Sequence, residues 1–195
     1  MKKGLFHPAY FAPLDQWLAI AGQDALVYER HDFFRKQTYR TRMHIYGANG
    51  MLKLSIPVIH TGAERRYTKE VRIENAFPWQ RNHWRSLVNA YRSSPYFEYF
   101  EDELVVFYEK KYDFLFDFLM ETQYWLMRQY DINPTVSFTN SYETAPGDST
   151  DYRPLIHAKE YRDTGIRYHQ VFEEKHGFLP NLSVLDKLFN TGPGK

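Results

Sequence analysis

The sequence predicts one domain of the α+β class, in which a small, mostly antiparallel sheet from the N-terminal half is covered by helices from the C-terminal half. The chain has 195 residues, which is the usual length of one domain, and 43% of them are hydrophobic. Strand patterns are concentrated before residue 75, whereas helical patterns dominate from residue 78 to residue 130. No repeat or low-complexity tract divides the sequence, so residues 1–195 are expected to form a single unit.

Short apolar runs and one turn signal carry the strand predictions. Asn49-Gly50 favours a tight turn, and Leu52, Leu54 and Ile56 alternate with polar residues after it, which predicts a β-hairpin. The prolines at positions 8 and 13 keep their predecessors extended. Extended segments or strands are expected at residues 5–13, 25–28, 42–46, 51–58 and 68–73.

Apolar residues at helical spacing predict the helices. The sequence favours a short helix at residues 14–21, a helix that begins at Pro78, and one or two helices from Ser94-Pro95 to about residue 130. Ser94 is expected to cap the latter. Near the C-terminus, Ser183 and Asp186 have the spacing of a capping box, and Gly192-Pro193 ends the last helix.

Residues 138–160 are predicted to form a long polar loop. The stretch 138–153 is rich in Ser, Thr, Asn, Asp, Gly and Pro and shows no periodicity. Long loops inside compact domains carry function more often than average. This loop is therefore a candidate contributor to a site.

Composition argues against several classes of protein. The absence of cysteine removes disulfides, thiolate metal sites and cysteine nucleophiles, and a net charge of +1 argues against nucleic-acid binding. His7-Pro8 interrupts the apolar stretch that a signal peptide needs, and no apolar run is long enough for a membrane span. A cytoplasmic location is expected. The eight histidines show no metal-ligand spacing, and no cofactor motif is present.

Basic residues accumulate in the first half of the chain. Between residues 30 and 72 the cations outnumber the acids Asp32, Glu64 and Glu70, which would suit an anionic small-molecule substrate. The alternative is that these cations lie on solvated faces and pair with acids of the helical half. The cations are Arg30, Arg35, Lys36, Arg40, Arg42, Lys53, Arg65, Arg66, Lys69 and Arg72.

Three segments resemble the WbqC-like family. They are His7-Pro8-Ala9-Tyr10-Phe11-Ala12-Pro13, the run Phe34 to Arg42 with the hairpin that follows it, and Phe178 to Gly192. The resemblance implies an accessory enzyme of bacterial cell-surface polysaccharide (O-antigen-type) biosynthesis, a transferase acting on a nucleotide-activated or amino sugar. Longer family members have a further segment where this chain has its polar loop. Whether this chain makes the substrate contacts of that segment is therefore left undecided by the resemblance.

Six residues are candidates for the site. His7 and His83 are candidate catalytic groups because imidazole transfers protons near neutral pH, although a lone histidine is more often structural. Arg42 is expected to hold an anion in a concavity shared with His7 or His83. The alternative for Arg42 is an ion pair with Glu101 or Asp102. The remaining candidates, expected to bind substrate, are Tyr10, Lys36 and Tyr39.

Two functions therefore stay open at the level of sequence. The first is the transferase, with a nucleotide sugar or a similar anion as substrate. The second is a non-catalytic binding or assembly protein of the same pathway that uses exposed aromatic side chains. A deep pocket next to the N-terminal motif would favour the enzyme, whereas a flat aromatic patch would favour the binding protein.

Overall fold

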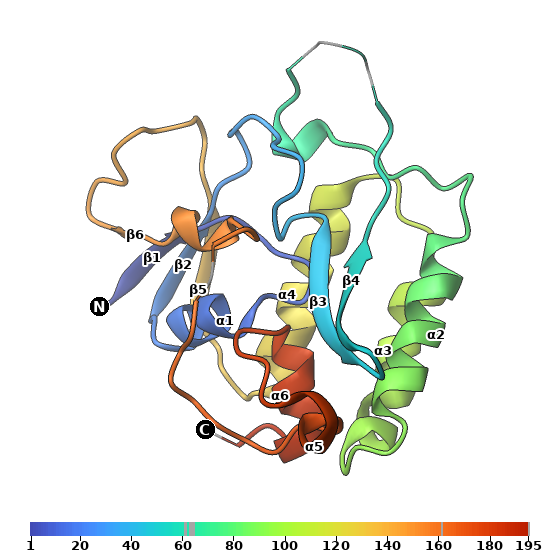
Figure 1. Ribbon diagram of the computed structural model, residues 1–195. Coiled ribbons are helices and arrows are strands. Elements are labelled where there is room, and N and C mark those ends of the chain that lie inside the picture. The colour runs from blue at the N-terminus through green and yellow to red at the C-terminus, as the bar shows by residue number, and fades with distance from the viewer. Residues whose placement is uncertain (61, 63–64, 161, 195) are drawn as a thin grey trace.

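The computed structural model describes residues 1–60, 62, 65–160 and 162–194, so Glu64 lies outside the described residues. The chain folds as an α+β structure with two separate sheets (Figure 1). Its elements are β1 (Lys3–Phe6), α1 (Leu14–Ala21), β2 (Ala25–Tyr28), β3 (Arg42–Gly47), β4 (Gly50–Ser55), the 3₁₀ turn η1 (Thr68–Glu70), α2 (Trp79–Tyr91), α3 (Phe97–Glu109), α4 (Leu115–Gln129), β5 (Thr135–Phe138), β6 (Thr150–Asp151), the 3₁₀ turn η2 (Arg153–Ile156), α5 (Glu173–His176) and α6 (Val184–Thr191).

The larger sheet is parallel. Its four strands have the order β5-β2-β1-β6, and every neighbouring pair is parallel. The prediction of a mostly antiparallel sheet was therefore wrong. These strands have two to four residues each and come from distant parts of the sequence, so neither alternation nor a turn signal indicated their pairing.

One face of the parallel sheet packs against α4. The register places Phe6, Tyr28 and Phe138 side by side across three strands, so their side chains share a face. The ring of Phe138 lies 5.9 Å from that of Phe116 on α4, and the Tyr28 hydroxyl donates to Gln123 Oε1 at 3.4 Å. These contacts fix the sheet against the longest helix of the helical half.

The predicted hairpin is confirmed, but its turn lies one residue earlier than the expected Asn49-Gly50. Strands β3 and β4 pair antiparallel from Arg42↔Ser55 to Gly47↔Gly50, so the two residues between the strands are Ala48 and Asn49. Gly50 adopts φ +99°, a conformation that favours glycine. Figure 1 shows the hairpin standing apart from the parallel sheet, with α2 and α3 on its far side.

The helix predictions were mostly right, with corrections at their first residues. The helix expected to begin at Pro78 begins at Trp79, and the one or two helices expected between residues 94 and 130 are two, α3 and α4. Ser94 does not cap α3, because the helix begins at Phe97 and the Ser94 hydroxyl donates to the carbonyl of Tyr91. Residues 68–73 do not form a strand: η1 occupies the first three, and only isolated bridges at Arg72 and Ile73 follow.

The segment after β1 is the centre of the molecule. Residues 7–14 are all buried, and their backbone is held by bonds from several distant elements. Tyr10 N donates to Tyr39 O, Gln123 Nε2 donates to Ala9 O, and Ser183 Oγ donates to Phe11 O. The first candidate motif is therefore fixed by contacts from the whole length of the chain.

The C-terminal helix α6 closes this arrangement. Ser183 caps it, since its Oγ accepts from Leu185 N at 3.3 Å, as the sequence predicted. Asp186 does not complete a capping box. Its buried carboxylate accepts hydrogen bonds at 2.8 Å from Tyr91, Tyr168 and Gln170, which ties α6 to α2 and to the segment before it.

Across the described part of the chain, none of the helices combines the length and the apolar character that crossing a membrane requires.

Candidate functional site at the carboxyl ends of the parallel strands

A cavity of about 270 Å³ opens where the parallel strands end. His7 follows β1, Asp32 and Arg40 come after β2, and Arg153 follows β6. From β1 the chain continues to β2, which lies beside β1 on one side, and it returns much later as β6, which lies beside β1 on the other side. The carboxyl edge at such a change of direction is where open parallel sheets bind their ligands.

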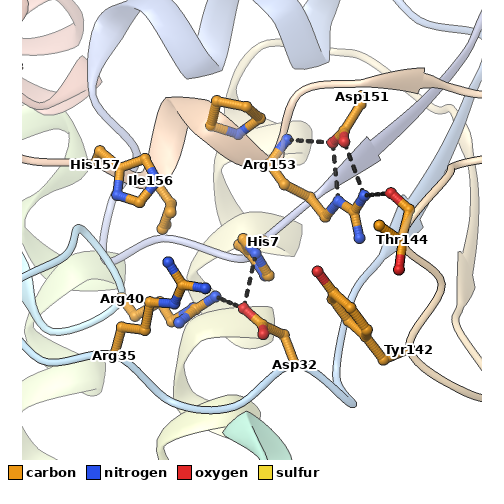
Figure 2. A pocket seen from close by; sticks show the side chains of 11 residues that line it. His7, Asp32, Arg35, Arg40, Tyr142, Thr144, Asp151, Arg153, Ile156 and His157 are labelled. Atoms are coloured by element: carbon orange, nitrogen blue, oxygen red, sulfur yellow. Dashed lines mark hydrogen bonds and ion pairs between the residues drawn. The ribbon is translucent and has the colours of Figure 1, made fainter.

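Charged side chains dominate the cavity. Three arginines (Arg35, Arg40, Arg153) line it together with two aspartates, Asp32 and Asp151. Figure 2 shows His7 between two charged pairs, Arg40 with Asp32 on one side and Arg153 with Asp151 on the other. With neutral histidines, the lining carries one positive charge in excess.

The first charged pair holds Arg40 in the interior. Arg40 is 1% exposed and donates from Nη2 to Asp32 Oδ2 at 2.8 Å. The same Asp32 oxygen lies 3.4 Å from His7 Nε2. Asp32 therefore sits between the guanidinium and the imidazole and can stabilise positive charge on either.

The second charged pair orients Arg153. Its Nε and Nη2 donate to the two oxygens of Asp151 at 2.9 and 2.8 Å, and its Nη1 donates to Glu143 O at 2.8 Å. These bonds lower the pKa of Asp151 and keep it ionised. The fully buried Glu29, at the end of β2, places Oε2 3.9 Å from Arg153 Nη1. Arg153 thus holds its positive charge in a fixed position at the cavity.

His7 is a neutral imidazole at physiological pH. Burial lowers its pKa well below 6.5, and the positive charges of Arg40, Arg153 and Arg35 lower the pKa further. The 3.4 Å approach of Nε2 to Asp32 is consequently not an ion pair in the resting protein. A neutral imidazole beside a carboxylate is suited to accept a proton.

Polar atoms without partners gather at this cavity. His7 Nδ1, Arg40 Nε and Arg40 Nη1 are buried and make no hydrogen bond with the described residues. Glu29 Oε2, next to Arg153, is in the same situation. Buried groups of this kind are rare in native proteins, and ligands or ordered waters usually satisfy them.

The structure separates His83 and Tyr10 from His7. Tyr10 is completely buried, and its hydroxyl lies 3.0 Å from His83 Nδ1 and 2.9 Å from the hydroxyl of Tyr108. Burial lowers the pKa of His83 to about 4 and raises that of Tyr10. These three side chains form a polar chain inside the core, and neither Tyr10 nor His83 lines the cavity.

The three remaining candidates lie on the run that leads into the hairpin. Lys36 and Tyr39 line two depressions next to the cavity, described below. Arg42 does not line the cavity, and its Nη1 contacts the Gln37 carbonyl at 3.5 Å. Of its two expected alternative partners, Glu101 pairs with Arg92, and Asp102 makes no ion pair with Arg42 in the described residues. The structure therefore brings Arg42 together neither with His7 nor with either acid.

Few of the cations in the basic first half pair with acids of the helical half. In the described residues, Arg72–Asp113 at 3.9 Å is the one ion pair between these cations and the acids of the helical half. Glu98 and Glu101 pair with Arg92, and Glu121 pairs with Lys110. The Arg35 guanidinium makes no ion pair with the described residues. The expected pairing with the helical half is thus limited to Arg72, but most of these cations do lie on exposed faces, and of the ten only Arg40 is buried.

Sequence reasoning missed Arg40, Asp32 and Arg153 as site residues. Arg40 belongs to the same run as Arg42, and Arg153 lies within the stretch 138–160 that was expected to be a functional loop. The structure has β6 and η2 inside that stretch, so it is not entirely a loop. That stretch supplies most of the cavity lining beyond the first half, including Tyr142, Thr144, Asp151 and Arg153. An arginine preceded two residues earlier by an acid, within such a stretch, is the signal that was present.

Comparison with known proteins gives one match. The chain matches the WbqC-like protein family over residues 7–162, which is more than half of its length. The third resembling segment, Phe178 to Gly192, lies beyond the matched residues. No curated protein and no solved structure matches the chain significantly. The matched region contains every residue of the cavity, and the chain belongs to the WbqC-like protein family.

Proposed function

We propose that the cavity binds the phosphate of a nucleotide-activated sugar, and that the protein is a transferase of bacterial cell-surface polysaccharide biosynthesis. The observation that carries the anion site is Arg40, a fully buried guanidinium with two nitrogens that lack a partner among the described residues. The pathway rests on the family resemblance, and the ligand class rests on the cavity.

The charge of the cavity supports an anion with several oxygens. Arg40 offers Nε and Nη1, and Arg35 offers a guanidinium without an ion pair to the described residues. Arginine binds phosphate or carboxylate through two parallel hydrogen bonds, which lysine cannot reproduce. Arg153 contributes charge, while its hydrogen bonds are already used by Asp151 and backbone carbonyls.

His7 is the proposed general base. In the transfer, a hydroxyl or amine of the acceptor attacks the sugar carbon that carries the phosphate. The carbon–oxygen bond breaks, and its electron pair leaves with the nucleotide phosphate. The acceptor proton passes to His7, whose imidazolium Asp32 stabilises across 3.4 Å, and then to the leaving phosphate. Arg35 and Arg40 stabilise the negative charge of the leaving group.

Titration calorimetry with a panel of nucleotide sugars tests the anion site. Arg40→Lys keeps a cation beside Asp32 but removes the planar fork, so it should weaken binding by about tenfold or more. Arg42→Lys is the matched control, two residues away and outside the cavity, and should bind like the wild type. An effect of Arg42→Lys with none from Arg40→Lys would refute the site. Thermal unfolding of both variants checks the fold.

A turnover assay separates the transferase from the second function, a binding or assembly protein without catalysis. For the transferase, ³¹P NMR should show release of free nucleotide in the presence of acceptor sugars, and His7→Gln should abolish release while binding persists. Binding by the wild type without any turnover would instead support the non-catalytic protein. Exposed aromatics such as Tyr99, 80% exposed, and Phe77, 64% exposed, would then be the surfaces to test.

A further inference from the structure

The cavity is followed by two further depressions along the surface. An open groove shares Arg35 and His157 with the cavity and adds Lys36 and Lys159. A second depression of about 230 Å³ shares Ala158, Lys159 and Glu160 with that groove. Figure 2 shows Arg35 and His157 together at one edge of the cavity, where the groove begins. The three spaces are therefore neighbours in a row, and together we call them the trough.

Two segments form the walls of the trough. Residues 35–39 make one wall and residues 157–160 make the other. The two walls are joined at their base, because Tyr39 N donates to Ile156 O at 2.9 Å. Gln37 adopts φ +64°, which turns the first wall between Lys36 and Thr38. This bond holds the two segments together, and the hollows follow one another from His7 towards Tyr39.

Chemical character changes along the trough. The groove has Arg35, Lys36 and Lys159 against one acid, Glu160. The far depression has apolar surface from Tyr39, Met51 and Pro180 and polar groups from His44 and Asn181. Its charged members are Lys159, Glu160 and Arg162, and Arg162 pairs with Asp15 and Glu160. Tyr39 and His44 lie edge to face, 5.3 Å apart. Aromatic and apolar surface with a few polar groups is what a neutral, polar-edged ring requires.

We infer that the far depression is a second subsite for the ring end of the ligand, remote from the reacting phosphate. This inference rests on the proposed function and extends it. The ligand is elongated: one phosphate lies at His7 and Arg40, a second charged group lies along Arg35 and Lys36, and an uncharged ring lies over Tyr39 and His44. A nucleoside diphosphate joined to a sugar has this order of groups.

The test compares pyrophosphate, which reaches only the charged part, with UDP-N-acetylglucosamine, GDP-mannose and dTDP-glucose. Wild-type protein should bind at least one nucleotide sugar about tenfold more tightly than pyrophosphate. Met51→Glu puts a carboxylate at the rim of the far depression, at a side chain that is 59% exposed. It should remove that preference and leave the pyrophosphate affinity unchanged.

Leu52→Glu is the matched control, because it changes the next residue of β4, whose side chain points to the opposite face. It should retain the preference. Equal affinities for pyrophosphate and nucleotide sugars in the wild type would overturn the second subsite and leave the anion site standing. The same loss in both variants, or equal loss of pyrophosphate and nucleotide-sugar binding by Met51→Glu, would also overturn it. Failure of every ligand to bind would overturn the proposed function itself.

Discussion

His7 and His83 are both buried and both neutral, yet their surroundings give them different roles. His7 lies beside Asp32 and four positive or titratable groups at the cavity, whereas His83 lies in the core between Tyr10 and Trp79. For His83 burial is the main cause of the lowered pKa, and the backbone of Ser55 opposes it. His83 therefore contributes to stability through its neutral form.

Lowering the pH should reveal this contribution of His83 as a loss of unfolding free energy. The folded pKa of His83 is about 4 against 6.5 for an ordinary histidine, so the unfolded chain binds the proton more strongly between these values. Stability is then fully present above the unfolded pKa and is lost as pH falls towards the folded one. His83→Gln should reduce the loss of unfolding free energy between about pH 7 and about pH 4.5 by about 2–3 kcal/mol.

Urea unfolding at several pH values measures this. The exposed His60 supplies the control, since His60→Gln should lose stability in acid as the wild type does. Parallel pH profiles for His83→Gln and the wild type would show that another group governs the acid limit.

At the residue scale, the choice between two arginines shows what the sequence could not decide. Arg40 and Arg42 stand two apart in one basic run. Strand β3 begins at Arg42, so Arg40 remains in the loop that reaches the cavity. That boundary depends on pairing with β4 and on the position of Asp32, and neither is a local property of the run. His7 was a candidate because Pro8 follows it and restricts its segment, and the structure places it at the cavity.

At the scale of elements, local sequence patterns predicted the helix at residues 14–21 and the hairpin, but they did not predict the pairing of distant strands. The helix at residues 14–21 was predicted with its observed bounds, and the hairpin followed from its turn residues. The strands β1, β5 and β6 are short, and β5 and β6 pair with strands far away in the sequence, so no local pattern predicted them. Because the cavity is assembled from the ends of these strands, missing the parallel sheet also meant missing most of the site.

The cap of α6 gives a prediction at this scale. Ser183 Oγ accepts from Leu185 N and donates to Phe11 O at 2.6 Å, so Ser183→Ala removes a cap and leaves a buried carbonyl without its donor. The free energy of unfolding should fall by about 1–3 kcal/mol. Ser86→Ala, on the exposed part of α2, should change it by less than about 0.5 kcal/mol. Equal denaturant midpoints for all three proteins would rule out this role of Ser183.

At the scale of the molecule, the folded unit extends beyond the part that matches the family. Beyond residue 162, the side chains of five apolar residues are almost completely buried: Leu182, Val184, Leu185, Leu188 and Phe189. Each contributes about 1.5–3 kcal/mol. Their sum is comparable to the whole stability of a typical domain, about 5–15 kcal/mol. Asp186 adds its hydrogen bonds to Tyr91 and Tyr168.

A chain truncated after residue 162 should therefore lack a cooperative unfolding transition. Circular dichroism during thermal unfolding measures this, and a chain lacking only residues 193–195 serves as the control. A truncated chain that unfolds cooperatively near the temperature of the full chain would mean that residues 7–162 are an independent domain.

The central segment after β1 also sets an order of events during synthesis. Pro13 pairs with Ser183, and Phe11 receives its hydrogen bond from the same serine, across almost the whole sequence. At about 5–20 residues per second, a ribosome needs about 10–35 s to make the chain between them. During that time β1 lacks first β6 and then α6 as partners. The surroundings of His7 are therefore completed only when residues far along the sequence have been made.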